Sequence, residues 1–266
     1  MSVKAMALVF QVLASGSKGN AVYVASPGTA LLLDAGLSAR EMVRRLENVG
    51  LPPRRLAGVL ITHEHSDHIR GAGVFSRRFD LPVYLTQATL EGLPSQLGEL
   101  AGVHIIHSGR LFNVGDLTVL PFSLSHDAAD PVGYIIEHDG CRLAVCTDCG
   151  TATQLVRTRL QHCHGLIVEA NHDVDRLKHG PYPWHLKQRI RSRHGHLSNE
   201  ECCDLLQDVH HQNLQVVVMA HLSEINNHPK LVEDTRLQRL HGEQWHHVRF
   251  LIAAQDRATP LCELSP

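Results

Sequence analysis

An apolar run that ends in a cluster of histidines constrains this chain more than any other feature. The segment from Leu60 to His68 places three histidines and one aspartate within six residues, directly after apolar residues typical of a strand. Residues two apart in an extended segment project to the same side, so His63 and His65 face one point, and Asp67 and His68 can face a second. Imidazole nitrogen and carboxylate oxygen suit Zn²⁺, Mn²⁺ or Fe²⁺. We therefore predict a metal site rather than a solvated, histidine-rich loop.

The composition of the chain narrows the classes of protein to which it can belong. The 266 residues are 43% hydrophobic, which is enough for one large domain or two smaller ones. The net charge of −2 provides no global basic field for nucleic acid, although a local basic groove can still bind phosphates. Seven cysteines, an odd number, do not resemble a disulfide framework. We found no signal-peptide pattern and no apolar stretch of 18 residues, so we expect a cytoplasmic protein without a membrane segment.

Short strand-like runs alternate with helical segments along the whole chain. No repeat or linker divides it, so we predict one α/β domain over residues 1–266, with sheets covered by helices. Capping-box spacing predicts helix starts at Ser38 and Ser198. The expected strands are 7–13, 21–25, 30–33, 57–61, 83–85, 103–106, 117–122, 134–137, 143–146, 166–169, 214–220 and 248–253, and two further helices are expected at 69–79 and 186–193.

The histidine cluster resembles the His-x-His-x-Asp-His signature of the metallo-β-lactamase superfamily. This resemblance implies the α/β (α+β) class, as a four-layer αββα sandwich with two metal ions at one edge of its sheets. Further family elements follow in order over residues 7–225: Asp34 after Leu31–Leu33, His126 in Ser-His-Asp, Asp148 in Thr-Asp-Cys-Gly and His221 in Ala-His-Leu-Ser. Cys149 departs from the family, which more often has Thr there.

The resemblance also implies a role for each of these residues. One ion would be held by His63, His65 and His126, the other by Asp67, His68 and His221, with Asp148 between the two ions. Asp34 would fix the adjoining loop and not bind an ion. Taken singly, His126 fits a solvated loop and Asp148 fits a turn, so the assignment depends on their joint order.

A second group of motifs resembles the WalJ/YycJ (VicX) branch of the superfamily, which is related to its nucleases. The matching segments include Glu169-Ala-Asn171-His172, Gly195-His196 and Asn226-Asn-His-Pro229. In the related tRNA 3′-processing enzymes, a glutamate after a strand and a histidine before a helix form a proton relay. The resemblance gives those roles to Glu169 and His196, and places Asn171 and His172 in the pocket wall.

Three weaker signals have two interpretations each. The basic stretch that contains Lys187 and Arg189 is either a solvated helix face or a phosphate-binding track. Tyr182 and Trp184 are able to stack on a base, but we expect them to pack in the core. The pair in Cys146-x-x-Cys149 has redox or zinc spacing, and we expect two small buried thiols.

The favoured hypothesis is a dinuclear metal-dependent phosphodiester hydrolase, namely a nuclease with DNA favoured over RNA, acting from an end. A metal-bridging hydroxide oriented by Asp67 would attack phosphorus, and His196, oriented by Glu169, would protonate the leaving alkoxide. One alternative is a small-molecule or cyclic nucleotide phosphodiesterase. The other is a metal-binding regulatory protein without turnover. The partner would be nucleic acid or another phosphodiester, and the oligomeric state stays open.

Overall fold

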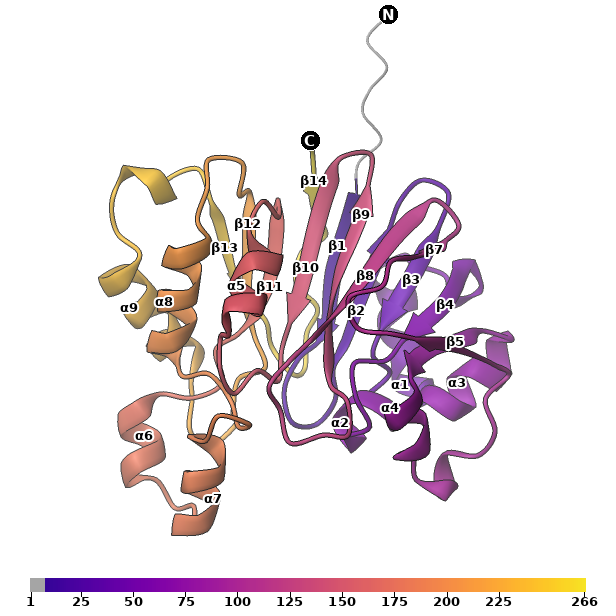
Figure 1. Ribbon diagram of the computed structural model, residues 1–266, viewed down its shortest axis with the longest axis horizontal. Coiled ribbons are helices and arrows are strands. Elements are labelled where there is room, and N and C mark those ends of the chain that lie inside the picture. Colours follow the sequence, from indigo (N-terminus) through magenta and orange to yellow (C-terminus); the bar gives the residue numbers. More distant parts are fainter. Residues whose placement is uncertain (1–7) are drawn as a thin grey trace, which may run out of the picture.

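The computed structural model describes residues 8–266, and two seven-stranded sheets form its centre (Figure 1). In order across the first sheet, the strands are β14 (Cys262–Leu264), β1 (Leu8–Ala14), β2 (Ala21–Ala25), β3 (Ala30–Leu33), β4 (Leu56–Leu60), β5 (Pro82–Thr86) and β6 (Gly102–Ile106). Across the second sheet they are β13 (Arg249–Ile252), β12 (Val216–Ala220), β11 (Gly165–Glu169), β10 (Cys141–Cys146), β9 (Val132–His138), β8 (Leu117–Ser123) and β7 (Phe112–Val114).

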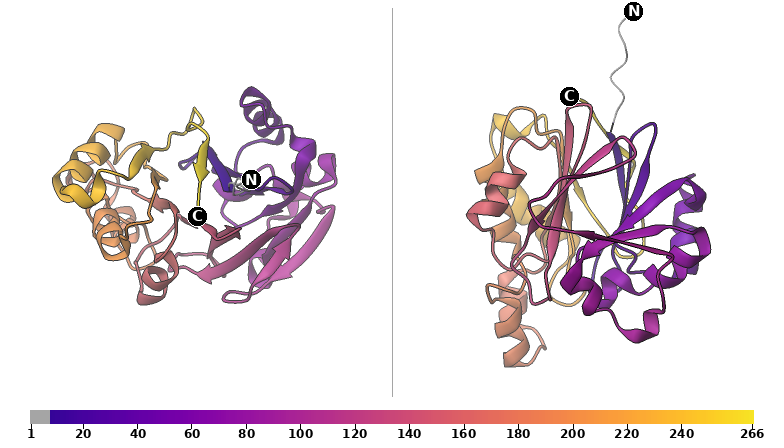
Figure 2. Two further views of the ribbon diagram at one scale, coloured as in Figure 1. Left: turned by 90° about the horizontal axis from the view of Figure 1, so that it is seen from above. Right: turned by 45° about the vertical axis from the view of Figure 1, so that its right-hand side comes forward.

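Helices cover the outer face of each sheet, as the two further views show (Figure 2). The first sheet carries α1 (Ala39–Asn48), α2 (Ser66–Ile69), α3 (Ala72–Phe79) and α4 (Gln87–Glu91). The second carries α5 (Gln154–Leu160), α8 (Asn199–Val209) and α9 (Pro229–Arg239), while α6 (Val174–His179) and α7 (Trp184–Ile190) project past its edge. The predicted four-layer αββα sandwich is confirmed.

Three apolar clusters hold the layers together. Alternate side chains of both sheets, such as Leu33, Val119 and Ile167, meet in a central core. Separate clusters form between each sheet and its helices, around Phe75 on the first side and Leu205 on the second. Strands buried on both faces explain why their sequences are continuous apolar runs rather than alternating ones.

The strand order brings the carboxyl ends of several parallel strands to one edge. In the first sheet β3, β4, β5 and β6 are parallel neighbours, and in the second β10, β11, β12 and β13 are. Side chains in the crevice beyond such ends converge, which is where ligands bind in open α/β sheets. Asp34, His63, Asp148, Glu169 and His221 each lie at or just after one of these strand ends.

The predicted elements fall close to the observed ones, with three differences, and β7, α4, α5, α6 and α9 were not predicted. The helix expected at 69–79 is two helices, because the Gly71 N–H donates to the Ala35 carbonyl at 2.8 Å and a side chain at Gly71 would collide with the Leu37 carbonyl. The helix expected at 186–193 ends at Ile190, whose carbonyl accepts from the His196 N–H at 2.9 Å.

The third difference is at the C-terminus, where the expectation that 248–253 is the last strand is wrong. β14 follows it and pairs antiparallel with β1. Both helix starts predicted from capping spacing are confirmed: Ser38 accepts from Glu41 N, and Ser198 forms a reciprocal capping box with Glu201. The expected first strand begins at Ala7, which lies outside the described residues, and the prediction of one domain over residues 1–266 stays a prediction.

Membrane insertion by a helix finds no support in the part of the chain that the structure describes. None of its helices combines the length and the apolar character that crossing a bilayer requires.

Candidate metal centre

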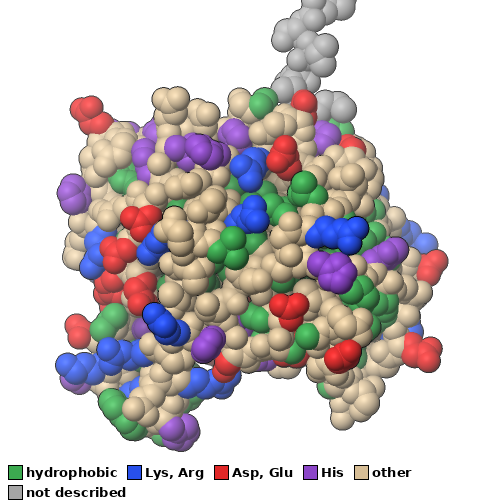
Figure 3. Space-filling view, in the orientation of Figure 1, with side chains coloured by type: hydrophobic (Ala, Val, Ile, Leu, Met, Phe, Trp, Pro, Cys, Tyr) green, Lys and Arg blue, Asp and Glu red, His purple; other side chains and the backbone are tan. Residues whose placement is uncertain are grey.

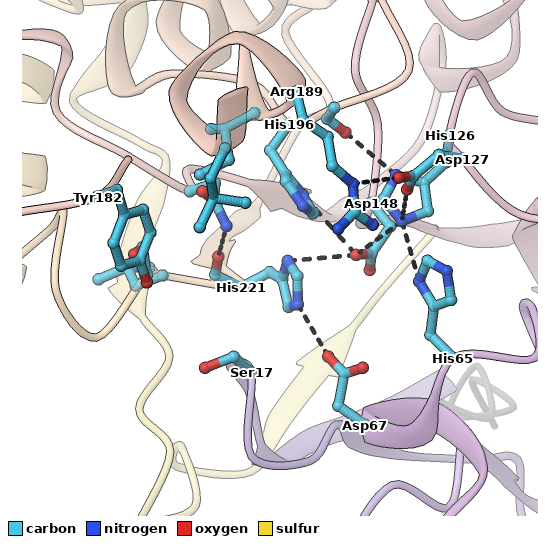
Figure 4. Close-up of a pocket in the computed structure, with 16 residues that line it drawn as sticks. Ser17, His65, Asp67, His126, Asp127, Asp148, Tyr182, Arg189, His196 and His221 are labelled. Atoms are coloured by element: carbon cyan, nitrogen blue, oxygen red, sulfur yellow. Dashed lines mark hydrogen bonds and ion pairs between the residues drawn. The ribbon is translucent and has the colours of Figure 1, made fainter. Parts of the chain in front are cut away.

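The seven predicted metal ligands converge at the sheet edge. Figure 4 shows His65, Asp67, His126, Asp148 and His221 facing one another. Their donor atoms form overlapping groups in which all members lie within 4.8 Å of one another. Three of the groups are His63, His65 and His126; Asp67, His68 and His221; and His63, His68 and Asp148. A fourth contains Asp148 and His221 together with Glu169 and His196. Asp148 connects the first two groups, because its carboxylate oxygens lie 3.2 Å from His68 Nε2 and 3.6 Å from His126 Nε2.

Three buried histidines of the cluster each donate a hydrogen bond from Nδ1 to an acceptor outside the cluster. His68 Nδ1 donates to Asp34 at 2.7 Å, His221 Nδ1 to Glu169 at 2.7 Å, and His126 Nδ1 to the Gly195 carbonyl at 3.1 Å. The opposite nitrogen of each ring then has a lone pair that faces the cluster, and that of His68 also accepts from Asn20 Nδ2 at 3.1 Å. This is how proteins orient histidines that bind metal ions.

Polar atoms inside the cluster lack partners of their own among the described residues. His63 Nε2 and Asp148 Oδ2 are buried and accept or donate no hydrogen bond there. Asp148 Oδ2 lies 3.2 Å from His68 Nε2, so a carboxylate oxygen faces the lone pair of an imidazole. Two such acceptors repel each other unless a proton or a metal cation lies between them. The residues therefore fit a divalent cation.

The charges of the neighbouring carboxylates point the same way. Burial lowers the pKa of His68, but Asp34 and Asp148 outweigh it and raise that pKa well above its usual value. The pKa of His221 is also raised, because Asp148 and Asp67 outweigh burial. Burial and the neighbouring imidazoles instead lower the pKa of His63 well below its usual value. The carboxylates thus stabilise positive charge at the centre of the cluster.

Thr62 is a site residue that sequence analysis missed. Its N–H and its hydroxyl donate to the Asp34 carboxylate at 2.9 and 3.0 Å, and its Oγ1 lies 3.0 Å from His63 Nδ1. Asp34 thereby holds Thr62 and His68 together and belongs to none of the groups of donor atoms. The signal available for Thr62 was its position between an apolar strand and His63.

Three residues of the site have a left-handed backbone conformation that sets the direction of their side chains. Asp34, Asp148 and His221 have φ values of 57°, 58° and 56° at the points where their strands end. Left-handed backbone is uncommon for residues other than glycine and clusters at functional sites. Next to them Gly36 lies so close to Asp67 that an added Cβ would be 1.6 Å from the Asp67 carbonyl oxygen.

Glu169 and His196 form a buried pair beside this cluster. Glu169 is fully buried, and its Oε1 accepts from His196 Nδ1 at 2.8 Å as well as from His221. Its Oε2 accepts from the backbone N–H groups of Cys149 and Leu197 at 3.0 and 3.1 Å. Burial opposes ionisation, but His196 and His221 lower the pKa of Glu169 to about 2.

His196 is the more accessible member of the pair. Its side chain is 21% exposed and lines a cavity of about 240 Å³ at the cluster, as does Asp67. Burial lowers the pKa of His196, but Glu169 outweighs it and the pKa is raised. An imidazole held this way at Nδ1 presents Nε2 to the cavity and can carry a proton near neutral pH.

Comparison with known proteins identifies the family. The profile of the Beta-lactamase superfamily domain matches residues 29–221. The chain is 38% identical over 228 residues to "Exodeoxyribonuclease YycJ" of Bacillus anthracis, covering 85% of this chain and 86% of the relative. It is 35% identical over 262 residues to "Exodeoxyribonuclease WalJ" of Streptococcus pneumoniae, covering 96% and 97%. This chain belongs to the YycJ/WalJ branch of the metallo-β-lactamase superfamily.

Solved structures of the superfamily share the fold across nearly the whole chain. The metallo-β-lactamase fold protein YhfI from Bacillus subtilis aligns with a TM-score of 0.75 and 16% identity, covering 97% of this chain and 99% of that one. The short form of human tRNase Z aligns with a TM-score of 0.65 and 15% identity, covering 94% and 98%. At this identity the likeness shows the fold alone.

The remaining predicted residues of this YycJ/WalJ relative divide between the cavity and its surroundings. Asn171 and Arg189 line the cavity, and Asn171 also donates to the His221 carbonyl at 2.9 Å. His172, expected in the pocket wall, is buried outside the lining instead, and burial lowers its pKa to about 4. Lys187 is directed away from the cavity, since its Nζ donates to the carbonyls of Lys178 and Gly180 at 2.9 and 2.7 Å.

Two expectations about neighbouring side chains have opposite outcomes. All seven cysteines are free and buried, which confirms the expectation for Cys146 and Cys149. The expectation that Tyr182 and Trp184 pack in the core is wrong, because Tyr182 lines the cavity and Trp184 is 68% exposed. Cavity-lining residues that were not predicted from the sequence are Leu186 and Ile190 of α7, and Ser17, Asp127, Leu222 and Ser223 of loops.

Proposed function

We propose that this protein is a metal-dependent nuclease with two ions, which removes nucleotides from an end of DNA. The observation that carries the proposal is the convergence of imidazole and carboxylate donors at a cavity that also contains the Glu169–His196 pair. The names of the YycJ and WalJ relatives, which cover most of this chain at 35–38% identity, support DNA as the substrate.

The groups of donor atoms in the structure support the ligand sets that the family resemblance implies. His63, His65 and His126 would hold one ion, Asp67, His68 and His221 the other, and Asp148 would contact both. Zn²⁺, Mn²⁺ and Fe²⁺ all suit these donors. When bound, two such ions activate water as a nucleophile and neutralise charge on the phosphate.

The protein's own groups orient the reactants and move the proton. Asp67 Oδ2 lies 3.5 Å from His221 Nε2 and faces the cavity, where it can accept a hydrogen bond from the attacking water. His196 would donate the proton on Nε2 to the leaving sugar oxygen, because Glu169 fixes its other nitrogen as a donor. A sugar alkoxide is a poor leaving group, so this protonation accelerates the cleavage.

Residues around these groups would support substrate binding. Arg189 lines the cavity, and its Nε donates to Asp127 Oδ2 at 2.5 Å. Its terminal nitrogens have no partner among residues 8–266 and can donate to a phosphate oxygen. Asp34 and Asn171 would fix the ligand loops through their bonds to His68 and to the His221 carbonyl. His172 would support the same region from within the protein, and we do not propose Lys187 as a phosphate ligand because its ammonium is occupied.

The test combines elemental analysis of the purified protein with digestion of end-labelled DNA and RNA, single- and double-stranded. We expect two equivalents of divalent metal and progressive shortening of DNA from one end. The substitution His65→Ala is expected to abolish digestion, while the exposed His246→Ala serves as the matched control. Full metal content without digestion of any polynucleotide would contradict the proposal and favour a regulatory protein. Hydrolysis of cyclic nucleotides alone would favour the small-molecule phosphodiesterase.

A further inference from the structure

The two helices α6 and α7 form an arm, residues 174–195, beside the candidate metal centre. The arm leaves the fold shortly after Glu169 and returns at His196, so it is inserted between the two members of the relay pair. It extends past the sandwich at the edge where the ligand loops lie (Figures 1 and 2). Tyr182, Leu186 and Arg189 of the arm line the cavity, so a polymer bound there can extend along the arm.

Charge on the arm is opposite in sign to that of the rest of the protein. Residues 174–195 contain six Lys and Arg against one Asp, a net charge of +5, so the remainder of the chain carries −7. Figure 3 shows Lys and Arg side chains gathered on the lower left of the molecule, where Figure 1 places α6 and α7. The net charge of the arm therefore attracts a polyanion.

Besides Arg189, whose terminal nitrogens can bind a phosphate in the cavity, three of the six cations are available for a ligand. Arg176 donates to the Asn227 carbonyl, and Lys187 and Arg189 have the contacts described above. Lys178, Arg191 and Arg193 are exposed, and none of them has a carboxylate within 4.0 Å among residues 8–266. Free guanidinium and ammonium groups on a surface bind phosphates in a salt-dependent way.

Trp184 adds a flat apolar surface to the arm. It is 68% exposed at the start of α7, although tryptophan normally buries a large area in a core. Tyr182, two residues earlier, lines the reactive cavity. Trp184 is thus an exposed ring two residues from the cavity wall, and stacking on an aromatic ring favours a base that is not paired in a duplex.

Contacts to the metal-ligand loops hold the arm in place. The Asp127 N–H donates to the His194 carbonyl at 3.1 Å, and His126 Nδ1 donates to the neighbouring Gly195 carbonyl. Lys187 joins α7 to the end of α6 through two carbonyls. A surface fixed in this way loses little entropy when it binds a ligand.

We propose that the arm binds the unpaired strand that extends from the reactive cavity. Lys178, Arg191 and Arg193 contact its phosphates, and Trp184 stacks on one of its bases. This inference rests on the proposed nuclease function and deepens it, because it assigns a place outside the cavity to single-stranded nucleic acid.

Binding of a fluorescent, phosphorothioate-linked oligothymidylate to the metal-loaded protein tests the arm, since this linkage is hydrolysed slowly. We expect weaker binding in a triple variant that combines Lys178→Ala, Arg191→Ala and Arg193→Ala. The slope of log affinity against log salt should fall by about 0.7 for each phosphate that the variant no longer neutralises. Trp184→Ala should weaken binding about fivefold to a hundredfold, and Trp184→Phe should retain most of the affinity because a ring remains.

Matched controls lie on other faces. Arg54→Ala removes an exposed cation from η1 (Pro53–Arg55), and Leu111→Ala removes an apolar side chain that is 61% exposed. Both should bind the oligonucleotide as the unmodified protein does. Metal content and melting temperature of the arm variants are measured in parallel, so that misfolding is recognised.

Three results would overturn the inference. The first is unchanged affinity and salt slope in the triple variant. The second is equal loss of affinity in Trp184→Phe and Trp184→Ala. The third is duplex DNA bound as tightly as the single strand with Trp184 irrelevant to both, which would assign the arm to duplex DNA.

The outcome is separable from that of the proposed function. If the metal-loaded protein digests no polynucleotide but binds the oligonucleotide through the arm, the nuclease proposal is wrong and the role of the arm in binding is supported. If the unmodified protein digests DNA but the arm variants bind and digest long single strands as the controls do, the role assigned to the arm is wrong and the nuclease proposal is supported. Sedimentation of the arm variants then tests whether this surface instead joins two copies of the chain.

Discussion

Replacing Glu169 by glutamine tests the connection between the relay pair and the metal ligands. The fully buried carboxylate accepts four hydrogen bonds, two from imidazole nitrogens and two from backbone N–H groups. Glutamine has nearly the same shape but offers only one oxygen. Because the backbone groups of Cys149 and Leu197 can only donate, that oxygen must turn toward them, and the amide nitrogen then faces His196 and His221.

Both imidazoles must respond to this change. If His221 keeps its proton on Nδ1, two buried donors face each other without acceptors, at a cost of about 1–3 kcal/mol for each unsatisfied group. If the proton moves to Nε2, His221 loses the lone pair that faces Asp67. Removing a residue that orients a histidine ligand typically costs about 10–100-fold in metal affinity. We expect a loss of this size for the ion at Asp67, His68 and His221, and a near-native affinity for the other.

Stepwise titration of the metal-free protein with Zn²⁺ or Mn²⁺, followed by elemental analysis, measures the two affinities separately. Turnover should fall by about a hundredfold or more, since His196 is no longer oriented as a proton donor. The exposed Glu137→Gln on β9 is the matched control. Native affinity for both ions together with native turnover in Glu169→Gln would refute the assigned connection.

Three further predictions address the loops that carry the ligands. Gly36→Ala should destabilise the fold by on the order of 3 kcal/mol and reduce metal content, because the new Cβ would overlap the Asp67 carbonyl; Gly102→Ala, whose nearest neighbours lie at 3.7 Å, should shift stability by less than about 0.5 kcal/mol in the same urea titration. Tyr134→Phe removes a buried 2.7 Å bond to the Ile61 carbonyl and should cost about 1–3 kcal/mol in that assay. Chelation should abolish digestion of DNA and lower the melting temperature. Adding metal back to about 100 times its Kd should raise the free energy of unfolding by about 2.7 kcal/mol.

The identity of the site residues could be predicted because the chemistry lies in one short segment. Four predicted ligands occur within His63–His68, and the strand before them follows from its apolar run. His126, Asp148 and His221 came from the resemblance and not from local pattern. The structure brings all seven together, and their role as ligands stays a prediction until metal is measured.

Other parts of the site depend on tertiary contacts that no local pattern encodes. The loop that contains Ser17 lines the cavity because Asn20 N donates to the Asp67 carbonyl at 2.7 Å, a contact between residues far apart in sequence. Trp184 was expected in the core on the basis of its residue type alone, but it lies on an arm whose projection depends on the fold. The occupied ammonium of Lys187 likewise follows from the packing of α7 against the end of α6.

The division of the ligands between the two sheets has a consequence for stability. His63, His65, Asp67 and His68 follow β4 of the first sheet, whereas His126, Asp148 and His221 follow β8, β10 and β12 of the second. Each proposed ion therefore has ligands from both sheets and joins loops that are otherwise held together by the central apolar core and by hydrogen bonds such as that from Tyr134 to the Ile61 carbonyl. The donor geometry does not exist until the sheets pack, so ions bind the folded chain far better than the unfolded one. Metal binding and sheet packing should consequently stabilise each other.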